Sequence, residues 1–134
     1  MNPAGTAVGT LPSMRRQIDY RLARKAVLRD WRRGRLSRLD VCDAHPELVR
    51  AARHVGEETL HDCPICEKVK LRLVSYVYGD ALKAANGRCI TSPAELERLG
   101  EVCEEFACYV VEVCTECSWN HLIRSYLLGR RHAV

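Results

Sequence analysis

Two short cysteine motifs decide the fold: Cys63-Pro64-Ile65-Cys66-Glu67-Lys68 and Cys114-Thr115-Glu116-Cys117-Ser118-Trp119. Each is a Cys-x-x-Cys turn, which presents two thiolates from one tight loop. Two such turns supply the four soft ligands of a tetrahedral zinc site and leave no open coordination position. We therefore expect one structural Zn²⁺, with the ligands Cys63, Cys66, Cys114 and Cys117.

Other chemistry for these four cysteines fits the pattern less well. Cysteine is often an unligated core residue, but two identical spacings beside expected strands are not a usual result of packing. A thioredoxin-type pair needs one Cys-x-x-Cys before a helix in a βαβ unit, and neither turn has that context. Iron in a rubredoxin-like site uses the same ligands, so the spacing does not distinguish it from zinc.

The other four cysteines are expected to be core residues. A second metal site, helped by His45, His54 or His61, is the lesser alternative for them. His61 and His121 are close to the turns in sequence and can hydrogen-bond either the site or the backbone. The four cysteines are Cys42, Cys89, Cys103 and Cys108.

Residues 57–134 are predicted to form a zinc-ribbon domain with antiparallel strands. The segment between Cys66 and Gly79 alternates, which predicts a strand, and further strands are expected at residues 106–113 and 119–128. The two turns are 47 residues apart, more than the ~15–20 of common zinc motifs. A helical insertion at about residues 80–105, opened by Ser92-Pro93, accounts for the excess. The expected strand faces are Val69, Leu71, Leu73 and Val77 on one side, and Lys70, Arg72, Tyr76 and Tyr78 on the other.

The N-terminal part is predicted to be helical and basic. Residues 1–12 have the composition of a flexible tail, and residues 13–56 predict three helices, at about 13–33, 37–45 and 46–55. The fold class is therefore α+β, with three helices followed by the four-cysteine zinc ribbon. Ten of the 21 Lys and Arg lie between Arg15 and Arg38, opposed only by Asp19 and Asp30.

The first helix places a basic arc opposite an apolar side formed by Tyr20, Ala23, Val27 and Trp31. Such an arc is commonly a solvated face, and attraction to phosphate or to an acidic protein is the functional alternative. Lys70 and Arg72, beside two tyrosines, offer a second partner-binding surface. The arc consists of Arg21, Arg24, Lys25, Arg29 and Arg32.

Several functional classes find no support in the sequence. There is no nucleophile with a base, no carboxylate pair and no glycine-rich phosphate loop, so we expect no enzyme and no small-molecule substrate. No stretch approaches the ~18 apolar residues that cross a bilayer. The start of the chain lacks a secretory pattern, so we expect reduced thiols and a cytoplasmic location.

The Cys-Pro-x-Cys and Cys-x-x-Cys-x-Trp motifs resemble the zinc ribbons of transcription and translation proteins over residues 61–128. The stretch Asp-Val-Cys-Asp-Ala-His-Pro-Glu-Leu-Val-Arg-Ala-Ala-Arg resembles a small family of uncharacterised actinobacterial proteins. The ribbon resemblance implies an accessory factor that binds RNA polymerase, the ribosome or nucleic acid. The alternative is a protein–protein adaptor, recognised through Trp31, Tyr20 and Leu28. A third, weaker alternative is an enzyme subunit or a metal-dependent redox sensor.

Overall fold

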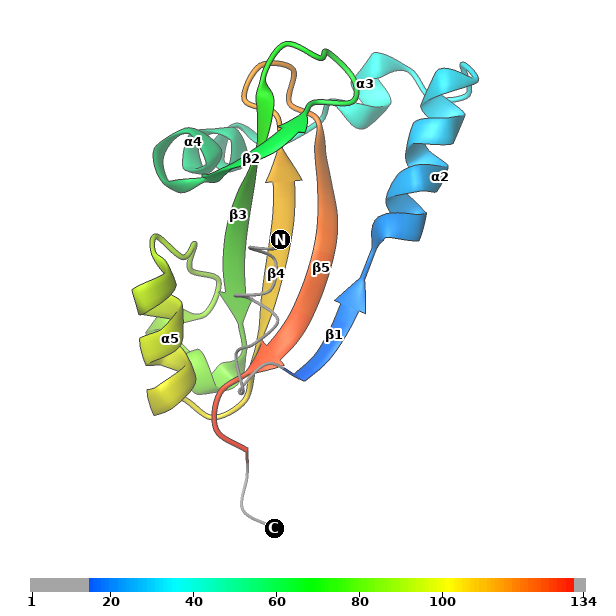
Figure 1. Ribbon diagram of the computed structural model, residues 1–134. Helices are drawn as coiled ribbons and strands as arrows, with labels where there is room; N and C mark the ends of the chain where they lie inside the picture. Colours follow the sequence, from blue (N-terminus) through cyan, green and yellow to red (C-terminus); the bar gives the residue numbers. More distant parts are fainter. Residues whose placement is uncertain (1–14, 132–134) are drawn as a thin grey trace.

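The computed structural model describes residues 15–131, so the tail expected at residues 1–12 lies outside the described part. Its centre is one curved antiparallel sheet with the strand order β1-β5-β4-β3-β2 (Figure 1). The fold is thus mixed α and β, as expected. The strands are β1 (Arg15–Asp19), β2 (Glu57–Asp62), β3 (Lys70–Tyr78), β4 (Phe106–Val113) and β5 (Asn120–Leu128).

Five helices surround the sheet within the described residues. Ser37 and Asp40 form the capping box of α3, and Ser92 accepts a hydrogen bond from the Glu95 amide at the start of α5. The insertion between β3 and β4 contains two helices, whereas the sequence predicted one. The helices are α2 (Arg21–Arg32), α3 (Arg38–Val41), α4 (Pro46–Val55), the 3-10 helix η1 (Asp80–Ala85) and α5 (Pro93–Val102).

Two strands were missed by the sequence analysis. Residues Arg15–Asp19, expected to begin a helix, form β1 along the edge of β5, and α2 begins only at Arg21. The segment before the first cysteine motif, for which no strand was expected, is β2, which pairs with β3. Both are edge strands with mostly exposed side chains, so they lack the buried alternation by which strands are recognised.

Helices cover both faces of the sheet. On one face, α4 buries Val74 of β3 and Val113 of β4 beneath Val49 and Ala52. On the other face, η1 and α5 cover a cluster around Phe106 at one end of the sheet. The predicted strand at β3 is confirmed, but Val74 is buried on the face that was expected to be polar, because α4 packs there.

The basic N-terminal segment packs against the sheet and the cysteine turns. β1 extends the sheet, α2 and α3 pack on the β5 side with the cysteine turns, and α4 packs on β3 (Figure 1). None of the described helices is long and apolar enough to cross a membrane.

Candidate metal centre

In both cysteine turns, the amide of the first cysteine donates to a backbone carbonyl that lies beyond the second cysteine. The Cys63 amide donates to the Val69 carbonyl at 2.9 Å, and the Cys114 amide donates to the Trp119 carbonyl at 2.8 Å. The first turn leads into β3, and the second joins β4 to β5. Because β3 and β4 are neighbours in the sheet, the two turns meet at one end of it.

Both turns place a non-glycine residue in the left-handed region directly after the second cysteine. Glu67 has φ 57° and Ser118 has φ 72°. Their amides donate to the carbonyls of Cys63 and Cys114 at 3.1 Å in each case. A left-handed non-glycine residue costs about 1–2 kcal/mol, and the same conformation at both positions lets each chain fold back so that its sulfurs point inward.

The four predicted ligands converge. The Sγ atoms of Cys63, Cys66, Cys114 and Cys117 all lie within 4.8 Å of one another. The Cys63–Cys117 and Cys66–Cys114 sulfur pairs are each 3.6 Å apart. A tetrahedron with metal–sulfur distances of about 2.3 Å has sulfur–sulfur distances of about 3.8 Å. The cluster can therefore hold one metal ion with little movement.

Backbone amides point at the inner sulfurs. The Ile65 amide donates to Cys63 Sγ at 3.4 Å, and the amides of Glu116 and Cys117 donate to Cys114 Sγ at 3.4 and 3.3 Å. Burial raises the pKa of Cys63 to about 11, against the opposing effect of the Cys66 and Ile65 amides. A thiol with a raised pKa keeps its proton at neutral pH, so a bound metal must displace that proton, and acidification weakens metal binding.

A fifth sulfur lies beside the cluster. Cys42 Sγ is 3.5 Å from Cys117 Sγ, at the end of α3. The sequence analysis placed Cys42 in the core, and it does pack against the cluster around Leu28 and Trp119. Its closeness to Cys117 was not expected, because a single cysteine 21 residues before the first motif carries no ligand spacing. The other cysteines outside the turns pack in hydrophobic clusters, as expected: Cys89 with α4, and Cys103 and Cys108 near Phe106.

The second turn is tied to α2 by a buried polar network. The Trp119 indole N–H donates to Glu112 Oε2 at 2.9 Å, and Arg24 Nε donates to the same oxygen at 2.6 Å. The Arg24 guanidinium also lies 6.0 Å from the centre of the Trp119 ring. Arg24, expected on the exposed arc, therefore lies on the inner side of α2, where it neutralises a carboxylate that is only 7% exposed.

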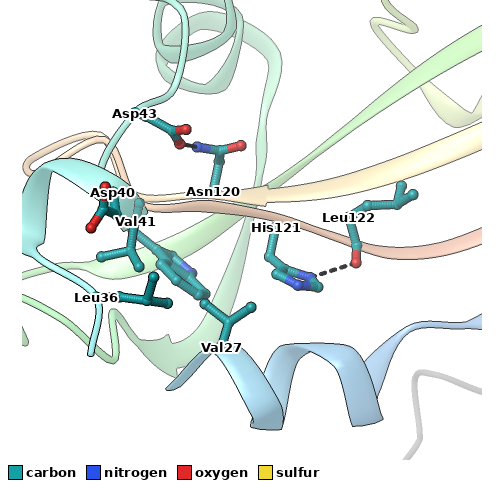
Figure 2. Close-up of a pocket in the computed structure, with 9 residues that line it drawn as sticks. Val27, Leu36, Asp40, Val41, Asp43, Asn120, His121 and Leu122 are labelled. Carbon is teal, nitrogen blue, oxygen red and sulfur yellow. Dashed lines mark hydrogen bonds between the residues drawn. The ribbon is translucent and has the colours of Figure 1, made fainter. Parts of the chain in front are cut away.

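A hollow of about 370 Å³ adjoins this network, between α2, α3 and the start of β5 (Figure 2). Its polar groups are largely occupied: His121 Nδ1 lies 2.7 Å from the Leu122 carbonyl oxygen, and Asn120 Nδ2 donates to Asp43 at 2.9 Å. The His121 ring stacks on Trp119, with ring centres 6.0 Å apart. His121 therefore contacts the backbone and the second turn, and is not among the clustered ligands.

The rest of the predicted basic arc is exposed on α2. Arg21 pairs with Asp19 at 2.7 Å, and Arg29 is 3.7 Å from Asp30. Lys25 and Arg32 form no ion pair within residues 15–131. The buried side of the helix consists of Arg24, Val27, Leu28 and Trp31, while Ala23, expected there, is exposed.

The second predicted basic surface is largely neutralised. Lys70 pairs with Asp62 at 2.8 Å, and Arg72 lies 4.0 Å from Glu58, both across the β2–β3 pair. The neighbouring tyrosines group with Tyr109 around a shallow hollow of about 600 Å³ on the sheet. The Tyr78 and Tyr109 rings meet edge to face, with centres 5.6 Å apart.

These features define a small α+β protein with a cluster of four cysteines that could hold a metal ion. The chain belongs to the family of unknown function DUF5318, which matches residues 11–134. It is 47% identical over 112 residues to uncharacterized proteins of Mycobacterium tuberculosis and Mycobacterium bovis, covering 84% of this chain and 81% of each relative. The resemblance to a small actinobacterial family is thereby confirmed. No solved structure matches the chain significantly.

Proposed function

We propose that the protein is a non-enzymatic binding factor in which one structural Zn²⁺ fixes the position of the basic helix α2. This helix docks onto a nucleic-acid-containing assembly of the transcription or translation machinery, such as RNA polymerase or the ribosome. The observation that carries this proposal is the shared cluster of the cysteine turns and α2. Leu28 of α2 is buried together with Ile65 of the first turn, Leu71 of β3 and Trp119, which follows the second turn.

Zinc is the metal that best suits the four sulfurs. Four thiolates at near-tetrahedral spacing, with two of them buried, match structural zinc sites. Iron accepts the same ligands, but zinc is the commoner occupant and needs no redox partner. Zinc would supply folding free energy that this small core needs, and no substrate position is left open.

The exposed arc of α2 suits a partner that carries phosphate. Arg21, Lys25, Arg29 and Arg32 face solvent, and cations at spacings of three or four residues repel one another by a few tenths of a kcal/mol per pair. A polyanion relieves this repulsion and releases its own counterions on binding. Arg33, Arg35 and Arg38 continue the positive charge beyond the helix.

Binding of the purified zinc-loaded protein to labelled duplex DNA and single-stranded RNA, measured by fluorescence anisotropy over a salt series, tests the proposal. Replacing Arg29 and Arg32 with Gln should weaken binding about tenfold and reduce the salt slope by roughly two, one for each lost phosphate contact. The matched control is Lys83→Gln with Arg98→Gln, which removes the same charge from exposed positions on η1 and α5. Equal binding by both double variants would show that α2 is not part of the interface.

A protein–protein adaptor is the second candidate. The contact residues first expected for it are not free, because Leu28 is buried and Trp31 and Tyr20 are half-buried against the core. Two other side chains favour it: Leu22 on α2 is 81% exposed and Leu39 on α3 is 85% exposed. Binding to a cellular partner that survives nuclease and high salt, and is lost in Leu22→Ser with Leu39→Ser, would favour the adaptor.

A further inference from the structure

The fifth cysteine beside the metal cluster has no role in a four-ligand site. Cys42 Sγ lies 3.5 Å from Cys117 Sγ, and both side chains are half-buried, whereas Cys63 and Cys114 are buried. The second cysteine of the first turn, Cys66, has no such neighbour outside the ligand set among the described residues. The metal cluster is therefore asymmetric: one of its ligands touches a thiol that metal binding does not use.

The contact between Cys42 and Cys117 is held from both sides. The Ala44 amide donates to the Ser118 carbonyl at 3.0 Å, and Asn120 Nδ2 donates to Asp43 at 2.9 Å. These two hydrogen bonds fix the segment that follows α3 along the second turn. To form a disulfide, the distance between the two sulfurs must fall from 3.5 Å to roughly 2.05 Å. Side-chain rotation with a small backbone shift is enough for this change.

We propose that Cys42 and Cys117 are a peroxide-reactive thiol pair, in which oxidation joins them in a disulfide and withdraws Cys117 from the metal. The inference rests on the proposed metal site. The Cys117 thiolate attacks hydrogen peroxide, which gives a sulfenic acid and hydroxide. The Cys42 thiol then attacks the Cys117 sulfur, so that the sulfur–sulfur bond forms, the sulfur–oxygen bond breaks and water leaves with the Cys42 proton. Two sulfurs lose one electron each, and the peroxide gains both.

Cys42 suits the resolving role because it stays free while the metal is bound. Any two of the four ligands are also close, but each must leave the metal before it can attack a partner. Disulfide formation leaves the metal with three thiolates, and weakened metal binding loosens the cluster that holds α2. Oxidation would thereby disturb the presentation of the basic arc.

The test uses the full-length zinc-loaded protein treated with hydrogen peroxide. Zinc release is followed with a chromogenic chelator, and disulfides are mapped by peptide mass spectrometry. We expect a Cys42–Cys117 linkage that forms along with zinc release, and release about tenfold slower in Cys42→Ser, which lacks the resolving thiol. Cys103→Ser, which alters a half-buried thiol in the Phe106 cluster, is the matched control and should behave as the parent does.

Release at the parental rate from Cys42→Ser, or a dominant linkage within the four ligands, would overturn the thiol pair. Cys42→Ser and Cys42→Ala must hold parental zinc before oxidation; if neither does, Cys42 is needed for the site itself and the proposal fails. If the reduced parent contains no metal, the proposed structural zinc fails. The linkage mapped in the same sample still decides whether Cys42 and Cys117 react together.

Discussion

The two cysteine turns have the same spacing and the same left-handed conformation directly after the second cysteine, but their surroundings differ. The first turn is followed by the exposed Lys68, whereas the second is followed by Trp119, which is buried and hydrogen-bonded to Glu112. The second turn also contacts Cys42 and, through Arg24, the helix α2. Both turns pack against Leu28 of α2, but only the second is followed by a residue that joins α2 through a hydrogen-bond network.

The largest expected effect is loss of metal, and it should be the same for both turns. Cys63→Ser and Cys114→Ser should each abolish metal binding, because both remove a buried ligand, and structural zinc supplies on the order of 10 kcal/mol in small zinc domains. Elemental analysis measures the metal. Hydrogen exchange should show α2 losing protection together with the turns, because Leu28 packs in their cluster. Full metal content in either variant would contradict the shared site.

The next effect concerns the network that only the second turn has. Glu112→Ala leaves the half-buried Arg24 without its carboxylate and Trp119 without its acceptor, and should cost about 3 kcal/mol of unfolding free energy. Chemical denaturation at saturating zinc measures this loss. Zinc content should stay at that of the parent, because no ligand changes. Glu97→Ala, at an exposed position of α5, is the control, and a similar loss in both variants would contradict the network.

Equivalent positions after the two turns give a smaller contrast. Trp119→Phe keeps an aromatic ring but removes the indole N–H that Glu112 accepts, so it should lower the unfolding free energy by about 1–2 kcal/mol. Lys68→Ala, at the matching position after the first turn, should change it by less than about 0.5 kcal/mol, because Lys68 is exposed. Both substitutions are measured by thermal and chemical unfolding. Equal losses in Trp119→Phe and Lys68→Ala would contradict the asymmetry between the turns.

The smallest expected effect concerns the left-handed residue that both turns have after their second cysteine. Glu67→Gly and Ser118→Gly should each raise the unfolding free energy by about 0.5–1 kcal/mol, because glycine adopts a left-handed conformation without the steric cost of a Cβ. The gain should be the same at both positions if the turns are conformationally equivalent. A loss at Ser118 alone would show that its surroundings constrain the turn more than its φ angle does.

The sequence by itself determined the cluster of four cysteines and most of the strands. Cys-x-x-Cys spacing is local, so each ligand pair is set by four consecutive residues, and the apolar runs at β3, β4 and β5 are long enough to identify without tertiary information. The helix starts at Ser37 and Ser92 were equally local, since each depends on a cap within three residues.

Only the tertiary structure decided how the basic segment is used. Arg24 and Arg29 are the same residue type on the same helix, so the sequence treats them alike. In the structure Arg24 faces Glu112, which lies on a strand and is 88 residues away in sequence. β1 exists because the edge of β5 accepts it, and Cys42 reaches Cys117 because the loop after α3 is bonded to the second turn. These contacts join residues distant in sequence, so their free energy depends on the arrangement of the whole sheet, which no local pattern encodes.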